Sequence, residues 1–211
     1  MNRSSTTALE VLTRLKSFYP QPQIALHWKT PWQLLVASVL SAQSTDKQIN
    51  KITPEFFARW PDPAALSRAR LEEVQDVIRP AGFYRVKAKN LINSANMIAQ
   101  KFNGQVPASM SELLLLPGVA RKTANVILFN AFGINKGIAV DTHVKRVSRR
   151  LKLTASDNPV RIEKDLMALF PGSEWGILNQ IMVLFGREIC KAKKPLCSSC
   201  PLADVCPSSR V

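Results

Sequence analysis

The chain has 211 residues, of which 46% are apolar, so it is long enough to bury one large core or two smaller ones. Its longest apolar runs, residues 34–40 and 113–116, are too short to span a bilayer, and residues 1–18 lack the apolar core of a signal peptide. We therefore expect a cytoplasmic protein. The net charge of +14, from 29 Lys and Arg against 15 Asp and Glu, favours a polyanionic partner, most commonly nucleic acid.

The fold class predicted from the sequence is all-α, with about ten helices joined by short turns marked by Pro or Gly. No run alternates between apolar and polar residues over the length of a strand. Three helix starts carry capping signals, namely Thr30 with Gln33, Ser109 with Glu112, and Asn158 with Pro159. Two further helices run into the terminating glycines Gly104 and Gly133.

The segment 109–133 predicts two helices joined by a tight turn. A short helix ends at Leu116, the turn is Pro117-Gly118-Val119-Ala120, and a second helix begins near Arg121. Backbone N–H groups at such a helix start have no partner within the helix, and the helix dipole adds positive charge there. This helix-hairpin-helix arrangement can therefore bind a DNA phosphate without reading sequence, although an ordinary pair of antiparallel helices would look similar.

Two residues that follow this turn are candidates for catalysis. Lys122 lies in the first turn of the second helix, where the helix dipole and Arg121 both disfavour the ammonium form and so favour a nucleophilic amine. Asp141 is expected at the N-cap of a basic helix, where a carboxylate near such a lysine could accept its proton. Taken singly, a solvated lysine and a simple N-cap aspartate are the competing interpretations.

The four cysteines lie within the last 22 residues, in the pattern C-x6-C-x2-C-x5-C formed by Cys190, Cys197, Cys200 and Cys206. In a cytoplasmic protein this clustering indicates a metal site before disulfides. The residue types alone leave tetrahedral zinc and a [4Fe–4S] cluster as alternatives.

Taken in order, LPGVARKTAN, VDTH and the cysteine loop resemble the motifs of the endonuclease III family of helix-hairpin-helix DNA repair enzymes. The resemblance implies two helical lobes. Residues 24–135 would form a helical barrel that contains the hairpin, and residues 1–23 with 136–211 would form a lobe that carries a [4Fe–4S] cluster on the four cysteines. It also implies that Lys122 is the Schiff-base lysine and Asp141 the catalytic aspartate, and that the two face each other across a lesion pocket.

The same resemblance suggests which residues contact DNA. SAQSTD at 41–46 implies that Gln43 fills the space left by a flipped base, and AGFYRVKAKN at 81–90 implies that Phe83 wedges into the opposite strand. A helix-end polar residue and a core aromatic residue are the alternatives. Further DNA contacts are expected from Gly118, Ala120, Arg121 and Lys191. Ala120 departs from the usual Gly-Val-Gly of the family hairpin and would be strained if the backbone there required a positive φ.

The predicted function is a monomeric base-excision repair enzyme, a DNA glycosylase with abasic-site lyase activity. It would bind damaged duplex DNA, remove oxidised pyrimidines and cut the strand 3′ to the abasic site by β-elimination. Two alternatives remain open. A monofunctional glycosylase of the same superfamily would generally lack the lysine, and adenine glycosylases carry an extra C-terminal domain. A non-enzymatic helix-hairpin-helix protein would bind DNA and show no activity that depends on Lys122.

Overall fold

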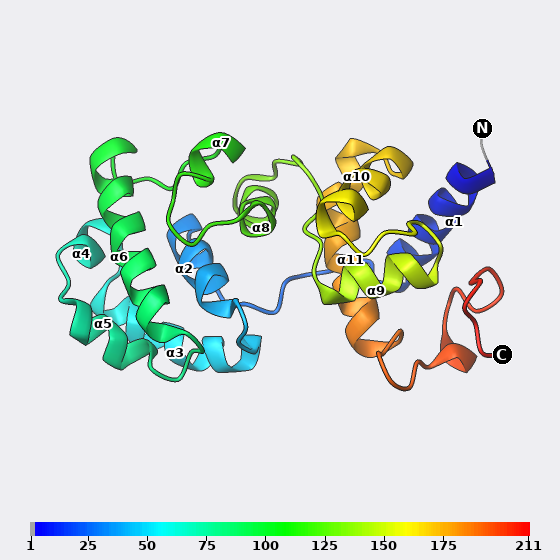
Figure 1. The fold of residues 1–211 in the computed structure, drawn as a ribbon, viewed down its shortest axis with the longest axis horizontal. Helices are drawn as coiled ribbons and strands as arrows, with labels where there is room; N and C mark the ends of the chain where they lie inside the picture. The colour runs from blue at the N-terminus through cyan, green and yellow to red at the C-terminus, as the bar shows by residue number, and fades with distance from the viewer. Residues whose placement is uncertain (1–2) are drawn as a thin grey trace. The chain divides into compact units, whose positions relative to one another are not determined.

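The computed structural model describes residues 3–211, and side chains from Thr7 onward. This part of the chain contains eleven α-helices, two short 3₁₀ helices and no strand, which confirms the all-α prediction. The chain divides into two compact units (Figure 1). One is Ala25–Ile134, and the other combines the N-terminal segment up to Ile24 with Asn135–Val211.

The unit Ala25–Ile134 is built around one apolar helix, α2. Its helices are α2 (Pro31–Ser41), α3 (Asp46–Arg59), α4 (Pro63–Ser67), α5 (Leu71–Ile78), α6 (Tyr84–Lys101), α7 (Met110–Leu113) and α8 (Arg121–Phe132). Residues 34–40 of α2 are all buried, because α3, α6 and α8 pack around it. A helix that is apolar on every side is stable in water only at such a central position.

The second unit packs α1 (Arg3–Phe18) with helices from the C-terminal part of the chain. These are α9 (Thr142–Arg150), α10 (Pro159–Leu169) and α11 (Trp175–Glu188), followed by the 3₁₀ helix η2 (Cys197–Ser199). Leu15, Val147, Leu166 and Phe185 are among the residues of its core. Helix α9 buries Val144 and Val147 while its basic side chains lie on the other face, so this helix is strongly amphipathic.

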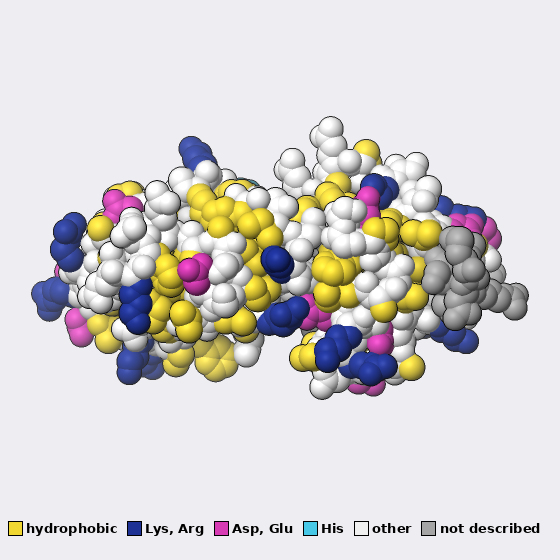
Figure 2. Space-filling view, turned by 90° about the horizontal axis from the view of Figure 1, so that it is seen from above, with side chains coloured by type: hydrophobic (Ala, Val, Ile, Leu, Met, Phe, Trp, Pro, Cys, Tyr) yellow, Lys and Arg dark blue, Asp and Glu magenta, His cyan; other side chains and the backbone are white. Residues whose placement is uncertain are grey.

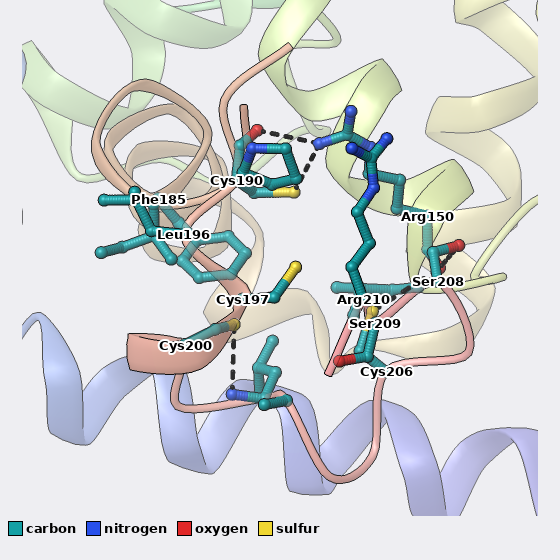
Figure 3. Close-up of a pocket in the computed structure, with 15 residues that line it drawn as sticks. Arg150, Phe185, Cys190, Leu196, Cys197, Cys200, Cys206, Ser208, Ser209 and Arg210 are labelled. Atoms are coloured by element: carbon teal, nitrogen blue, oxygen red, sulfur yellow. Dashed lines mark hydrogen bonds between the residues drawn. The ribbon is translucent and has the colours of Figure 1, made fainter. Parts of the chain in front are cut away.

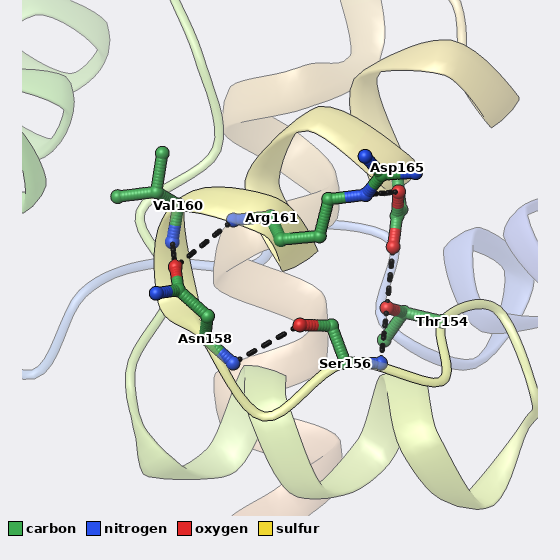
Figure 4. A network of polar contacts seen from close by, with 6 residues as sticks. All are labelled: Thr154, Ser156, Asn158, Val160, Arg161 and Asp165. Atoms are coloured by element: carbon green, nitrogen blue, oxygen red, sulfur yellow. Dashed lines mark hydrogen bonds and ion pairs between the residues drawn. The ribbon is translucent and has the colours of Figure 1, made fainter.

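The capping residues predicted from the sequence begin the helices as expected. Thr30 Oγ1 accepts a hydrogen bond from the amide of Gln33, and Ser109 Oγ accepts one from the amide of Glu112. Asn158 accepts the amides of Val160 and Arg161 at 2.9 and 3.2 Å, at the start of α10. Figure 4 shows how this cap continues into the preceding loop, where the Asn158 amide donates to Ser156 Oγ and the Ser156 amide donates to Thr154 Oγ1.

The basic residues are distributed over the molecule. Figure 2 shows Lys and Arg side chains scattered across the drawn face of each unit, between apolar and uncharged side chains. No helix in the described residues is long and apolar enough to cross a membrane. The basic side chains drawn in Figure 2 are thus spread over both units and are not confined to one tail.

Candidate functional site

The predicted hairpin is present, and its second helix begins without a side-chain cap. α8 starts at Arg121, and its N-cap residue Ala120 makes no side-chain hydrogen bond. The first backbone bond of the helix runs from the amide of Ala124 to the carbonyl oxygen of Ala120 at 2.9 Å. Gly118 and Ala120 are both exposed. An exposed helix N-terminus whose cap residue offers no acceptor is well suited to bind an anion.

The turn of the hairpin packs against α6. Ser94 Oγ donates a 2.9 Å hydrogen bond to the carbonyl oxygen of Pro117. A Cβ at Gly118 would lie 3.0 Å from the side-chain nitrogen of Asn90. The positive φ of this turn is at Gly118, at 83°, whereas Ala120 has an ordinary φ of −90°. The strain expected at Ala120 for a positive φ is therefore absent, and its Cβ requires no distortion of the hairpin.

Lys122 and Asp141 occupy helix starts in different units. Lys122 is an exposed residue in the first turn of α8, next to Arg121, which is also exposed. Asp141 is the N-cap of α9, as predicted, and its Oδ1 accepts the amides of His143 and Val144, both at 2.8 Å. Both bonds use the same oxygen, so the cap orients the carboxylate and leaves Oδ2 for another partner.

His143 is held between α9 and α11. Its Nδ1 lies 3.2 Å from Nη2 of Arg146, and the same Nη2 donates to the carbonyl oxygen of Gly186 at 2.6 Å. A Cβ at Gly186 would approach the Cβ of His143 to 2.9 Å, so the two helices touch here. Burial lowers the pKa of His143, and the nearby Asp141 only partly offsets this. His143 is thus a partly buried side chain beside the N-cap aspartate, and its burial disfavours the charged form.

Gln43 and Phe83 lie at the tips of two adjacent turns of the same unit. Both have positive φ, 55° and 58°, which is uncommon for residues other than glycine. Both are exposed, and 65% of the Phe83 surface is accessible. The two turns are in contact through a hydrogen bond of 3.1 Å, which the amide of Gly82 donates to Ser44 Oγ. Phe83 is therefore not the core residue that was its alternative interpretation.

Lys87 is a polar residue beneath these turns that the sequence did not single out. Only 5% of its surface is exposed, and burial lowers its pKa. In the sequence it stands between Arg85 and Lys89, both of which are exposed. Residue type and spacing alone do not separate one buried cation from two solvated neighbours.

The four cysteines come together at the end of α11 and in the loop that follows. Figure 3 shows Cys190, Cys197, Cys200 and Cys206 around one pocket. The volume of this pocket is about 270 Å³. None is in a disulfide. The amide of Leu202 donates to Cys200 Sγ at 3.4 Å. Burial raises the pKa of the Cys200 and Cys206 thiols.

Arg150 of α9 holds this loop in place. Its guanidinium group contacts Cys190 (Figure 3), with Nη1 3.2 Å from Cys190 Sγ. Nη1 also donates to the carbonyl oxygen of Lys191 at 2.8 Å, and Nη2 donates to that of Ala192 at 2.9 Å. Lys191, Lys193 and Lys194 are exposed on the same loop. Arg150 thus fixes the backbone between the first two cysteines, while the lysine side chains remain on the surface.

The geometry of the pocket favours a cluster over a single zinc ion. A tetrahedral zinc with bonds of about 2.3 Å would bring the four sulfurs to within about 4 Å of one another. A space of about 270 Å³ lined by four thiols instead fits a larger group, such as a [4Fe–4S] cluster.

Family models match two parts of the chain. Residues 36–172 match the HhH-GPD superfamily of base excision DNA repair proteins. Residues 190–206, which begin and end at the outer cysteines, match the iron–sulfur binding domain of endonuclease III.

Similar proteins extend this likeness over nearly the whole chain. The chain is 50% identical to endonuclease III of Synechocystis over 203 residues, which is 96% of this chain and 93% of that protein. It is 39% identical to endonuclease III of Escherichia coli over 198 residues, covering 94% and 93% of the two chains.

Solved structures agree with these relatives. A non-covalent endonuclease III–DNA complex is 42% identical and superposes with a TM-score of 0.91, covering 97% of this chain and 95% of that one. A trapped endonuclease III–DNA covalent intermediate is also 42% identical, with a TM-score of 0.91 and coverage of 97% and 96%. A thermostable thymine-DNA glycosylase shares the fold at 21% identity, with a TM-score of 0.88 and coverage of 98% of both chains.

Proposed function

The chain belongs to the endonuclease III family, within the helix-hairpin-helix superfamily of base excision DNA repair proteins, and we propose that Lys122 and Asp141 carry its chemistry. It is a DNA glycosylase with abasic-site lyase activity, its partner is damaged duplex DNA, and its cofactor is a [4Fe–4S] cluster. We infer further that its substrates are oxidised pyrimidines, and that it works in the cytoplasm in association with the nucleoid.

Binding begins at the uncapped start of α8. The exposed turn at Gly118 and Ala120 and the first turn of α8 offer backbone N–H groups and a positive helix end to one phosphate. Arg121 beside them, and Lys191 on the cysteine loop, add positive charge for further phosphates. Contacts of this kind do not depend on the base sequence, as a repair enzyme that scans all DNA requires.

The damaged base must leave the helix before it can react. Gln43 and Phe83 project from adjacent turns, both exposed, and they would enter the stack from which the base departs. An apolar side chain can separate two base steps, and a polar one can fill the space that the flipped base leaves. We assign Phe83 the first of these roles and Gln43 the second.

In the reaction, Asp141 accepts a proton from the Lys122 ammonium group, and the amine attacks C1′ of the sugar. The bond from C1′ to the base breaks, and the base leaves with the electron pair and is protonated. Opening of the sugar ring then gives a Schiff base between Lys122 and C1′. Loss of a proton from C2′ expels the 3′ phosphate, and water finally releases the lysine. The Asp141 carboxylate also stabilises the positive charge that develops on the sugar.

The cluster would be held by Cys190, Cys197, Cys200 and Cys206 and would fix the loop that carries Lys191. When bound it supplies a rigid crosslink among four points of this loop. An assay for iron and acid-labile sulfide tests this assignment, with about four of each per chain expected in the wild type. A Cys197→Ser variant should lose the cluster, and a protein that contains only zinc would contradict the assignment.

The observation that carries the catalytic proposal is Lys122 in the first turn of α8, directly after the uncapped hairpin. Borohydride reduces a Schiff base and so traps the protein on DNA. We expect a covalent adduct with a duplex that contains thymine glycol, and no adduct with Lys122→Ala. Lys101→Ala, which removes an exposed lysine from the end of α6, is the matched control and should still be trapped.

The other outcomes of this trapping experiment identify the alternatives. Base release without an adduct would place the chain among monofunctional glycosylases. DNA binding with neither adduct nor base release, across a panel of oxidised pyrimidines, would contradict the enzymatic assignment of Lys122. An adduct that persists in Lys122→Ala would show that another amine is the nucleophile.

A further inference from the structure

Lys87 uses all three of its ammonium protons inside the protein. Its Nζ donates to the carbonyl oxygen of Leu40 at 2.7 Å, to that of Ala42 at 2.6 Å and to Ser44 Oγ at 3.2 Å. An ammonium group has three donors and no acceptor, so these contacts satisfy it fully. A lysine that is 5% exposed is rare, because burying a charge is costly unless its hydrogen bonds are replaced.

The partners of Lys87 belong to the end of α2 and the turn after it. Leu40 lies in the last turn of α2, and Ala42 is its C-cap residue. Carbonyl groups at a helix C-terminus lack helical partners and form the negative end of the helix dipole. The ammonium group therefore acts as a cap from a distant helix. It stabilises this helix end and fixes the start of the turn that carries Gln43.

The same lysine connects this turn to the one that carries Phe83. Ser44 Oγ contacts Lys87 Nζ and also accepts the amide of Gly82 at 3.1 Å. A Cβ at Gly82 would lie only 3.2 Å from the carbonyl oxygen of Gln43, so the two backbones are in close contact. Lys87, Ser44 and Gly82 thus form a continuous chain of hydrogen bonds beneath the two turns.

Both turns hold a side chain in an unfavourable backbone conformation. Gln43 and Phe83 have φ of 55° and 58°. Conformations of this kind persist only where surrounding contacts determine the backbone. The exposed side chain of Phe83 supplies little of that support, whereas the hydrogen bonds of Lys87 and Ser44 lie directly under the two turns.

We propose that Lys87 is a positioning residue that joins the turns of Gln43 and Phe83 into one preformed wedge, so that both side chains enter duplex DNA together. The inference rests on the proposed function, in which these two side chains occupy the gap left by a flipped base. Lys87 itself touches neither DNA nor the reacting atoms. Because Lys87 holds both turns in place beforehand, the enzyme does not lose conformational entropy in ordering two separate loops when it opens the DNA helix.

The test compares two substrates under single-turnover conditions. One is a thymine glycol duplex, in which the helix must be opened. The other is a single-stranded oligonucleotide with an abasic site, in which there is no helix to open and only Lys122 chemistry is needed. Lys87→Met keeps the length and apolar stem of the side chain but removes the donors. We expect it to slow duplex excision by about 10- to 100-fold and single-strand cleavage by less than about 3-fold.

The controls separate positioning from folding and from charge. Lys89→Met removes an exposed lysine two residues away on the same helix and should leave both rates unchanged. Ser44→Ala removes the hydroxyl that bonds both Lys87 Nζ and the Gly82 amide but leaves the bonds of Lys87 to Leu40 and Ala42. It should therefore give a weaker form of the same selective loss even if Lys87→Met fails to fold. If Ser44→Ala, or a folded Lys87→Met, slows both substrates equally or neither, the proposal is overturned.

A double variant distinguishes this proposal from the function on which it rests. Gln43→Ala with Phe83→Ala should slow duplex excision selectively, and adding Lys87→Met should then have little further effect. If that double variant excises as the wild type does, the wedge assignment itself fails. If it is slow while a folded Lys87→Met is as fast as wild type, the wedge stands and the role of Lys87 is refuted.

Discussion

Ser94 Oγ donates a hydrogen bond of 2.9 Å to the carbonyl oxygen of Pro117, and this bond ties α6 to the turn of the hairpin that is proposed to bind DNA. Ser94 is completely buried. Removal of the hydroxyl would therefore deprive the Pro117 carbonyl group of this donor.

Replacing Ser94 with Ala should lower the free energy of unfolding by about 1–2 kcal/mol, because the Pro117 carbonyl loses its donor. It should also weaken binding to undamaged duplex DNA, because the turn becomes less ordered. Urea unfolding and fluorescence anisotropy measure the two effects. Ser67→Ala removes a hydroxyl that bonds only within α4 and is the control. Equal loss of DNA affinity in the two variants would contradict this role of Ser94.

Gly118 should be much more sensitive to substitution than Ala120. Gly118→Ala places a Cβ at φ 83° and 3.0 Å from Asn90, so we expect a loss of more than about 1 kcal/mol and weaker DNA binding. Ala120→Gly restores the usual residue of the family at an ordinary φ and should change stability by less than about 0.5 kcal/mol. Chemical unfolding measures the free energy of unfolding of both variants. A larger loss of stability in Ala120→Gly than in Gly118→Ala would refute the prediction.

Asp141→Asn separates the capping role of this residue from its chemical role. Asn is as good an N-cap as Asp, so the start of α9 and the melting temperature should be preserved. The variant cannot take a proton from Lys122, and excision of thymine glycol should fall by about 100-fold or more. Asp157→Asn makes the same charge change on an exposed loop and should excise normally. Normal excision by Asp141→Asn would remove this residue from the mechanism.

Phe83→Gly should reduce activity without reducing stability. The exposed ring contributes little burial, and glycine relieves a positive φ that costs about 1 kcal/mol in other residues. We therefore expect a melting temperature no lower than that of the wild type, together with slower excision from duplex DNA. Asn103→Gly relieves a similar φ of 51° at the end of α6 and should leave activity intact. A marked loss of stability in Phe83→Gly would show that the ring packs against the fold.

His143 should make the protein less stable in mild acid. Burial lowers its pKa below the ordinary value of 6.5, so the unfolded chain binds a proton more readily than the folded one. This contribution to stability is complete above pH 6.5 and is lost as the pH falls from there towards the lowered pKa. The melting temperatures of the wild type and of His143→Gln, measured between pH 7.5 and 5, isolate the contribution of His143. Curves that run parallel for the two proteins would contradict the prediction.

The sequence alone predicted those features that depend on neighbours in the chain. The caps Thr30, Ser109 and Asn158 bond to amides two or three residues away, so their signals are complete within a few positions. The same holds for the hairpin turn and the start of α8. The cysteine pattern also lies within one short segment, and its spacing together with the order of the other motifs indicated a cluster.

Only the tertiary structure revealed how distant segments support the predicted site. Ser44 and Gly82 are 38 positions apart, and Lys87 reaches Leu40 across 47 positions. No local pattern distinguishes Lys87 from the exposed basic residues beside it, because its burial depends on where α2 ends in space. The positive φ values of Gln43 and Phe83 have the same origin, since intrinsic preference opposes them and long-range contacts hold them. Residue types thus predicted the chemistry, and packing between distant segments determined the conformation in which the side chains are presented.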